Sequence, residues 1–120
     1  MEMLNILIIV LIAYFLVQTF LPIKGVKQIS TNELKNELKS KEKQFIDVRT
    51  PAEYKGRHIK EFKNIPLHLL KQNLNHLSKD QETIIICQSG MRSKKACKVL
   101  KKMGYTNITN VKGGMSSWSL

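Results

Sequence analysis

The chain has 120 residues, enough for one domain with a modest hydrophobic core. Its 20 Lys and Arg against 9 Asp and Glu give a formal net charge of +11, which favours anionic partners. The lysines are spread along the chain without an aromatic-rich strand, and there are only 2 cysteines, so a nucleic-acid-binding protein and a disulfide-rich secreted scaffold are both disfavoured.

The first 23 residues differ in composition from the rest. Twelve apolar residues follow one another from Ile6 to Val17, and the mostly apolar segment covers residues 3–21. As a helix this segment would span roughly 28 Å, close to the ~30 Å hydrocarbon core of a bilayer. A cleaved signal peptide and a buried core helix are the alternatives. We expect residues 1–23 to form a single transmembrane anchor and the start of a linker.

The positions of the basic residues predict the orientation of this anchor. No Lys or Arg precedes residues 3–21, and all of them follow. The positive-inside rule therefore predicts a single-pass protein of the cell membrane with residues 22–120 in the cytoplasm. Both cysteines suit that reducing compartment without pairing.

Strands and helices alternate after the anchor. In chain order we expect a strand at 26–29, a helix at 30–40, a strand at 45–48, an irregular polar stretch at 52–64, a short extended piece entering a helix at 67–77, a strand at 83–86, a helix from about 92 to 104, a strand at 108–111 and a final helical turn around 118. Such alternation predicts an α/β fold with a mostly parallel sheet and helices on both faces.

The segment after the apolar run 83–86 carries the strongest chemical signal. It reads, in order, Cys87, Gln88, Ser89, Gly90, Met91, Arg92 and Ser93. Ligands of such sheets bind at the carboxyl ends of the strands, and a helix follows here, so backbone N–H groups can converge on an anion. Gly90 supplies the positive φ that a tight loop needs. We expect Cys87 to be a nucleophile favoured as thiolate, with Arg92 holding an anionic substrate.

The remaining candidate ligands do not form a second site. Cys97 lies in the middle of a predicted helix and is interpreted as a packing residue. His58, His68 and His76 lack the spacing of a zinc site, so we expect no metal and no cofactor.

Several short motifs together resemble a single-domain rhodanese, a family of sulfurtransferases. They are Phe45-Ile46-Asp47-Val48-Arg49, Glu53-Tyr54, His58-Ile59, Asn64-Ile65-Pro66-Leu67, Cys87 to Ser93, Gly104-Tyr105 and Gly113-Gly114-Met115-x-x-Trp118. The resemblance covers about residues 26–120 and implies that residues 24–120 form a rhodanese-like domain. In one place it departs from the family, because the usual Gly-His-Ile-x-Gly-Ala reads Arg57-His58-Ile59-Lys60-Glu61-Phe62.

The resemblance implies a persulfide mechanism without a cofactor. Cys87 would accept a sulfane sulfur from thiosulfate or a persulfide and pass it to a thiol or another thiophilic acceptor. The amides of residues 88–92 would surround the outer sulfur, and Arg92 would bind the anionic end of the donor. Asp47 and Arg49 would support the loop as an ion pair.

Three alternatives remain open at this point. A Cys-loop phosphatase or arsenate reductase is disfavoured because those phosphatases have five residues between Cys and Arg, whereas four separate Cys87 from Arg92, and no acid lies within the loop. A silent binding module would need neither of these two residues. The third alternative is a tethered persulfide carrier whose true substrate is a partner protein.

Overall fold

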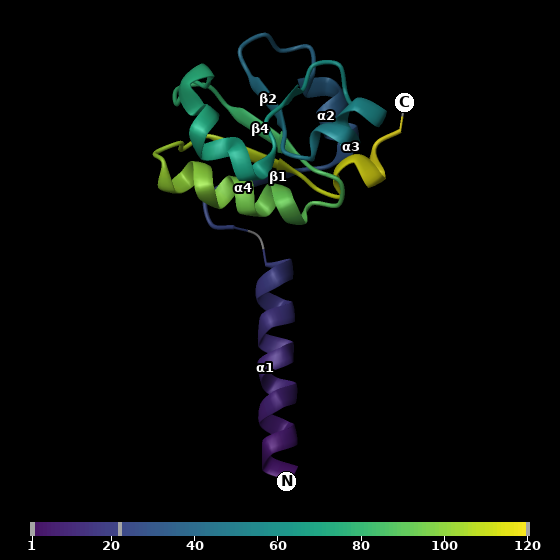
Figure 1. The fold of residues 1–120 in the computed structure, drawn as a ribbon, viewed down its shortest axis with the longest axis vertical. Coiled ribbons are helices and arrows are strands. Elements are labelled where there is room, and N and C mark those ends of the chain that lie inside the picture. The colour runs from purple at the N-terminus through teal and green to yellow at the C-terminus, as the bar shows by residue number, and fades with distance from the viewer. Residues whose placement is uncertain (1, 22, 120) are drawn as a thin grey trace.

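The computed structural model describes residues 2–21 and 23–119 (Figure 1). Helix α1 (Glu2–Phe20) projects away from the remaining elements, which pack together around one sheet. The sheet has five parallel strands in the order β1-β5-β4-β2-β3. Their bounds are β1 Val26–Ile29, β2 Gln44–Asp47, β3 Lys63–Asn64, β4 Thr83–Ile86 and β5 Ile108–Val111.

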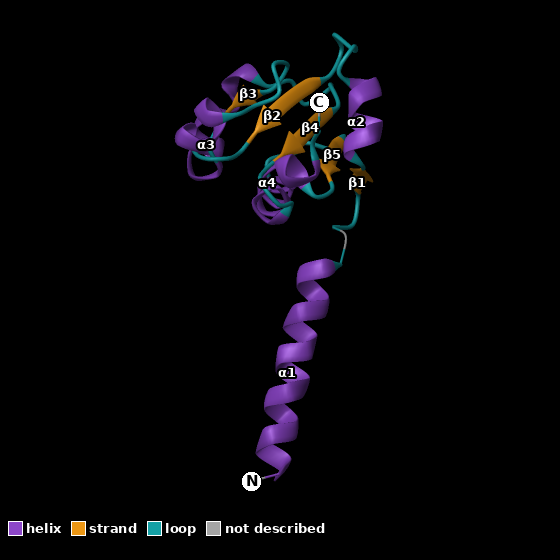
Figure 2. Ribbon diagram, turned by 90° about the vertical axis from the view of Figure 1, so that its right-hand side faces the viewer, coloured by secondary structure: helices purple, strands orange, loops and turns teal. Residues whose placement is uncertain are grey.

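Helices cover both faces of this sheet, as predicted. They are α2 (Thr31–Glu37), α3 (Pro51–Gly56), the 3-10 helix η1 (Leu67–His76), α4 (Met91–Lys102) and the 3-10 turn η2 (Gly114–Ser117). Figure 2 shows α2 on one side of the sheet and α4 on the other. The α/β architecture with a parallel sheet is therefore confirmed.

The central strand β4 contributes side chains to two hydrophobic cores, because its side chains alternate between the faces of the sheet. Ile84 and Ile86 lie in one core with Leu34 of α2, whereas Ile85 lies in the other with Leu100 of α4. All of these side chains are fully buried. Cys87 follows the same alternation and belongs to the core on the α4 side.

The prediction of a membrane anchor is wrong. A helix does form over Glu2–Phe20, but within the described residues no helix is both long and apolar enough to cross a membrane. The uninterrupted apolar run of residues 6–17 spans only ~18 Å, well short of the ~30 Å hydrocarbon core, and Glu2, Asn5 and Gln18 lie at its ends. The predictions of a single-pass location, of a cytoplasm-facing orientation and of membrane contact through residues 3–21 depend on this anchor and are wrong as well.

Two local predictions also differ from the structure. The prediction of an irregular stretch at 52–64 misses α3 (Pro51–Gly56), which forms because Thr50 and Glu53 make a capping box and Pro51 occupies the first turn. The helix expected at 67–77 is a 3-10 helix interrupted at Asn73, whose φ of −120° is not helical.

Substitution of Leu100 by Ala should lower the free energy of unfolding by about 2–5 kcal/mol, because this fully buried side chain joins α4 to the sheet. Urea denaturation of the full chain would measure the loss. The matched control is Met103→Ala, at the end of the same helix and 41% exposed, which should change stability by less than about 0.5 kcal/mol. Equal losses in the two variants would contradict the assignment of Leu100 to the core.

Candidate active site

Cys87 lies at the carboxyl end of β4, inside the loop that leads into α4. Its side chain is fully buried. The Sγ atom accepts a hydrogen bond from the Gly90 amide at 2.9 Å and lies 3.3 Å from the Ser93 hydroxyl, which donates to the Gly90 carbonyl at 3.0 Å. The loop therefore curls around the sulfur and directs the Gly90 amide at it, while the Ser93 hydroxyl lies within reach on the other side.

Gly90 makes this curl possible. Its φ of +101° lies in the left-handed region, as the sequence predicts, and it is the N-cap residue of α4. The first amides of a helix lack carbonyl partners within the helix and carry its positive end. Because α4 begins at Met91, this positive end lies directly beside Cys87.

The 3-10 turn η2 near the end of the chain forms hydrogen bonds to the backbone on the other side of the loop. The Met115 amide donates to the Cys87 carbonyl at 2.8 Å, and the amide and hydroxyl of Ser116 both donate to the Gln88 carbonyl, at 2.9 and 2.8 Å. Gly114, with a φ of +55°, packs so closely that a Cβ atom there would overlap the Cys87 carbonyl group.

Asp47 and Arg49 form a buried ion pair beneath the loop. Arg49 is 3% exposed, and its Nε and Nη2 donate to the Asp47 carboxylate at 2.8–3.1 Å. Its Nη1 also donates to Gln88 Oε1 at 3.3 Å, and its Nη2 to the Arg57 carbonyl at 2.6 Å. Arg49 thus connects the end of β2 to the loop and to the segment that follows α3.

Arg92 is held by a partner that the sequence analysis did not assign to the site. Its two terminal nitrogens donate to the two carboxylate oxygens of Glu53 at 2.6 and 2.8 Å. Both side chains remain about one-third exposed. The Arg92 guanidinium, together with hydrogen bonds from Thr50, lowers the pKa of Glu53 to about 2 although partial burial opposes the shift. Glu53 lies 39 positions before Arg92 in the chain, so no local pattern signals their contact.

A hollow of about 350 Å³ adjoins Arg92 at the carboxyl edge of the sheet. Its other lining residues are Val48, Thr50, Pro66, Leu67 and His68, which follow β2 and β3. Cys87 is not among the lining residues. The hollow is mainly apolar with one cation at its wall, which suits an organic group attached to an anionic or sulfur-bearing end.

The remaining predicted residues are placed as follows. Ser89 and Met91 are exposed, Gln88 is half-buried, and Ser93 is buried beneath the sulfur. Cys97 is fully buried on α4, and burial, together with the charge of Cys87, raises its pKa to about 12. Among the residues that the structure describes, no cluster of His, Cys, Asp or Glu is arranged to hold a metal ion.

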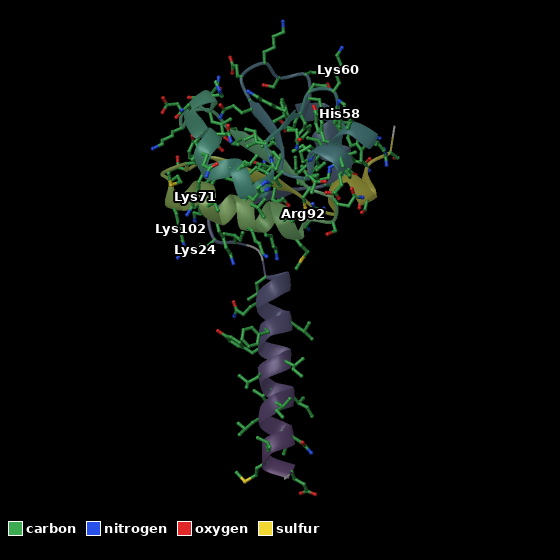
Figure 3. The ribbon with its side chains drawn as sticks, in the orientation of Figure 1. Lys24, His58, Lys60, Lys71, Arg92 and Lys102 are labelled. Atoms are coloured by element: carbon green, nitrogen blue, oxygen red, sulfur yellow. The ribbon has the colours of Figure 1, made fainter. Side chains whose placement is uncertain are left out.

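The segment that departs from the expected motif is well connected. Arg57 donates to the Trp118 carbonyl at 2.7 Å, and His58 stacks on Tyr54 with ring centroids 3.9 Å apart. Figure 3 shows His58 and Lys60 on the opposite side of the sheet from α4.

Comparison with known proteins places this geometry in a family. The sequence model of the rhodanese-like domain matches residues 30–120. An uncharacterised Bacillus subtilis protein, YqhL, is 34% identical over 116 residues, covering 95% of this chain and 92% of its own length. A sulfurtransferase of Allochromatium vinosum is 36% identical over 75 residues, covering 62% and 70%. The crystal structure of a rhodanese-like domain protein from Staphylococcus aureus superposes with a TM-score of 0.72 at 40% identity, covering 78% of this chain and 92% of that one.

Substitution of Gly114 by Ala should reduce sulfur transfer by at least about tenfold, because the added methyl group displaces the backbone of Cys87 and Gln88 and the left-handed φ strains alanine. Sulfurtransferase activity of the full chain would be measured with several sulfur donors and an added thiol. The matched control is Gly56→Ala, where an added Cβ meets nothing within 4 Å and activity should be unchanged. Full activity of Gly114→Ala would show that the last turn does not set the loop.

Substitution of Glu53 by Gln should remove an acid-sensitive part of the stability. Because folding lowers the pKa of Glu53 from 4.5 to about 2, its interactions stabilise the fold above pH 4.5 and are lost as the pH falls toward 2. The gap in urea midpoint between wild type and Glu53→Gln should therefore be constant near neutral pH and shrink between pH 4.5 and 2.

Arg92→Gln provides the control for this effect. In that background Glu53→Gln should change the midpoint much less, since the largest cause of the pKa shift is gone. A gap that stays the same from pH 6 to about 2 in the wild-type background would show that the ion pair does not contribute to stability.

Proposed function

This chain belongs to the rhodanese-like domain family and is a sulfurtransferase, and we propose that it carries the transferred sulfur as a persulfide on Cys87. The observation that carries the proposal is the position of the Cys87 sulfur, 2.9 Å from the Gly90 amide and at the positive end of α4. Donors in this arrangement stabilise negative charge on the sulfur that is attacked, and on the sulfur that is then held.

In the first half-reaction the Cys87 thiolate, after losing its proton to solvent, attacks the sulfane sulfur of the donor. A bond forms between Sγ and that sulfur, and the bond between the sulfane sulfur and the rest of the donor breaks. The electron pair of the broken bond leaves with sulfite when the donor is thiosulfate, or with a thiolate when it is a persulfide. No external oxidant or reductant is needed.

In the second half-reaction a thiolate acceptor attacks the outer sulfur of the Cys87 persulfide. The acceptor leaves as a persulfide, and the electron pair of the broken sulfur–sulfur bond returns to Cys87 as thiolate. The enzyme thus has two states and a ping-pong cycle.

Arg92 and the adjoining hollow account for donor and acceptor binding. Glu53 takes one hydrogen from each terminal nitrogen of Arg92, and a guanidinium carries five N–H donors, so others remain for a sulfonate or carboxylate. The apolar wall next to Arg92 could receive the carbon skeleton of a low-mass thiol or of a partner protein's cysteine. We propose thiosulfate and small persulfides as donors and thiols as acceptors.

Phosphoester hydrolysis, the main alternative, is disfavoured by the acids of the site. A phosphatase needs a general acid to protonate the leaving alcohol. Glu53 is the carboxylate at the loop arginine, and its pKa of about 2 keeps it ionised at neutral pH. It therefore cannot donate the proton.

The proposal predicts that the full chain incubated with thiosulfate gains one sulfur, about 32 Da, and releases one sulfite. Intact-mass spectrometry measures the gain, and dithiothreitol should remove it. Cys87→Ser should gain nothing. The matched control is Cys97→Ala, which removes the other thiol and should retain the gain, because burial holds the pKa of Cys97 near 12.

The outcome with other donors completes the test. A gain from glutathione persulfide but not from thiosulfate would restrict the donor to persulfides. If neither donor adds sulfur to the wild-type chain, or if the added sulfur remains in Cys87→Ser, the persulfide on Cys87 is refuted.

A further inference from the structure

The solvent-facing side of α4 is strongly basic and carries no acid. Between Met91 and Lys102 there are six basic residues and no Asp or Glu. Among the residues that the structure describes, none of Lys95, Lys98 and Lys102 has an ion-pair partner, and all three are exposed. Lys101, also exposed, donates to the backbone carbonyl of Lys24 instead. Figure 3 shows Lys24 and Lys102 close together beneath α4.

This charge arrangement is unfavourable for the helix itself. Lys98 has a lysine three or four positions away on both sides, and such like-charge pairs destabilise a helix. The cations in the first turns also oppose the positive end of the helix dipole. Lys101 and Lys102 suit the negative end of the helix, but Lys95 and Lys98 do not stabilise α4, so their charge is available to something that α4 meets outside the chain.

Two exposed apolar side chains lie at the ends of the same helix. Within residues 23–119 the large apolar side chains that are exposed are Met91, at 48%, and Met103, at 41%. They stand at the two ends of α4. Methionine is adaptable and is common at surfaces that accommodate varied partners. A basic face with an adaptable apolar residue at each end is complementary to an acidic protein surface.

The face also has a hollow of about 410 Å³. Met91, Lys95 and Lys98 line it from α4, and Leu21 and Ile23 line it from the segment that precedes β1. It could receive an apolar side chain of a partner while carboxylates around that side chain pair with the lysines.

We infer that this α4 face, made of Met91, Lys95, Lys98, Lys101, Lys102 and Met103, docks an acidic protein that exchanges sulfur with Cys87. The inference rests on the proposed function, because the partner is taken to exchange sulfur with Cys87. Met91 directly follows Gly90, so a partner bound at this face would have its thiol next to the loop. A face about 18 Å long from Met91 to Met103, at ~1.5 Å per residue, exceeds a single small anion and fits an acidic protein surface. Docking would raise the local concentration of the partner thiol at the loop.

The test uses the full chain with two fluorescent peptides of equal length, each carrying one cysteine, one rich in glutamate and one rich in lysine. Fluorescence anisotropy should show binding of the glutamate-rich peptide, weakening by at least about tenfold as salt rises from about 0.05 to 0.5 M. The lysine-rich peptide should not bind. Tighter binding of a single-stranded oligonucleotide than of the glutamate-rich peptide would overturn the inference in favour of nucleic acid.

Charge reversal then locates the surface. The triple variant Lys95→Glu, Lys98→Glu, Lys102→Glu should weaken binding of the glutamate-rich peptide by at least about tenfold. The matched control, Lys39→Glu, Lys41→Glu, Lys60→Glu, has the same change in net charge at exposed lysines outside α4 and should bind nearly as wild type. If both triple variants bind the glutamate-rich peptide equally weakly, net charge alone explains the binding and the docking face is refuted. If the α4 variant does not fold, the salt dependence and the peptide preference of the wild type still decide.

Sulfur transfer separates this inference from the proposed function. After loading with thiosulfate or glutathione persulfide, the α4 variant should deliver sulfur to dithiothreitol at the wild-type rate but to the glutamate-rich peptide about tenfold more slowly. Equal rates to both acceptors would refute docking while sulfur transfer stands. Binding of the acidic peptide, also to Cys87→Ser, without any sulfur uptake by the wild type would support the docking face while refuting the proposed function.

Discussion

The loop around Cys87 depends on the packing of the last turn of the chain against its backbone. Gly114 leaves no room for a side chain next to the Cys87 carbonyl, and the amides of Met115 and Ser116 bind the carbonyls of Cys87 and Gln88. With those two carbonyls bound to the last turn, the Gly90 amide that follows faces the sulfur. The geometry around Cys87 therefore depends on the C-terminal turn as well as on β4.

The two arginines of the site act in different electrostatic settings. Arg49 is buried, and a buried guanidinium is tolerable only with a bound carboxylate, which Asp47 provides. Its Nη1 donates to Gln88 Oε1, so Arg49 links the end of β2 to the loop. The exposed Arg92 shares its charge with Glu53, which orients the fork but reduces its net attraction for an anion. The positive end of α4 then supplies much of the field at the sulfur.

The parts of the site that the sequence predicted are those set by local chemistry. The left-handed turn at Gly90 follows from residue type and position, because only glycine adopts that φ at low cost. Thr50 and Glu53 also carry a local signal, a capping box, but Thr50-Pro51 favours a break after the strand, so the prediction of an irregular stretch at 52–64 missed α3. The contact of Glu53 with Arg92 depends on tertiary packing, which no local pattern encodes. The apolar run at residues 6–17 predicted a helix correctly but not a membrane span, because its length was ambiguous.

Helix α4 joins the chemistry of the loop to the surface of the molecule. Its buried side packs Ala96 and Leu100 against the sheet, which fixes the direction in which its first amides point. Its exposed side carries lysines that weaken the helix as a folding unit but add to the positive potential at the same end. An anionic partner would relieve this repulsion at the moment that it reaches the loop. One helix thus has two separable roles, because its buried side and first turn position the loop around Cys87, whereas its exposed lysines affect the stability of the helix and the proposed attraction for an acidic partner.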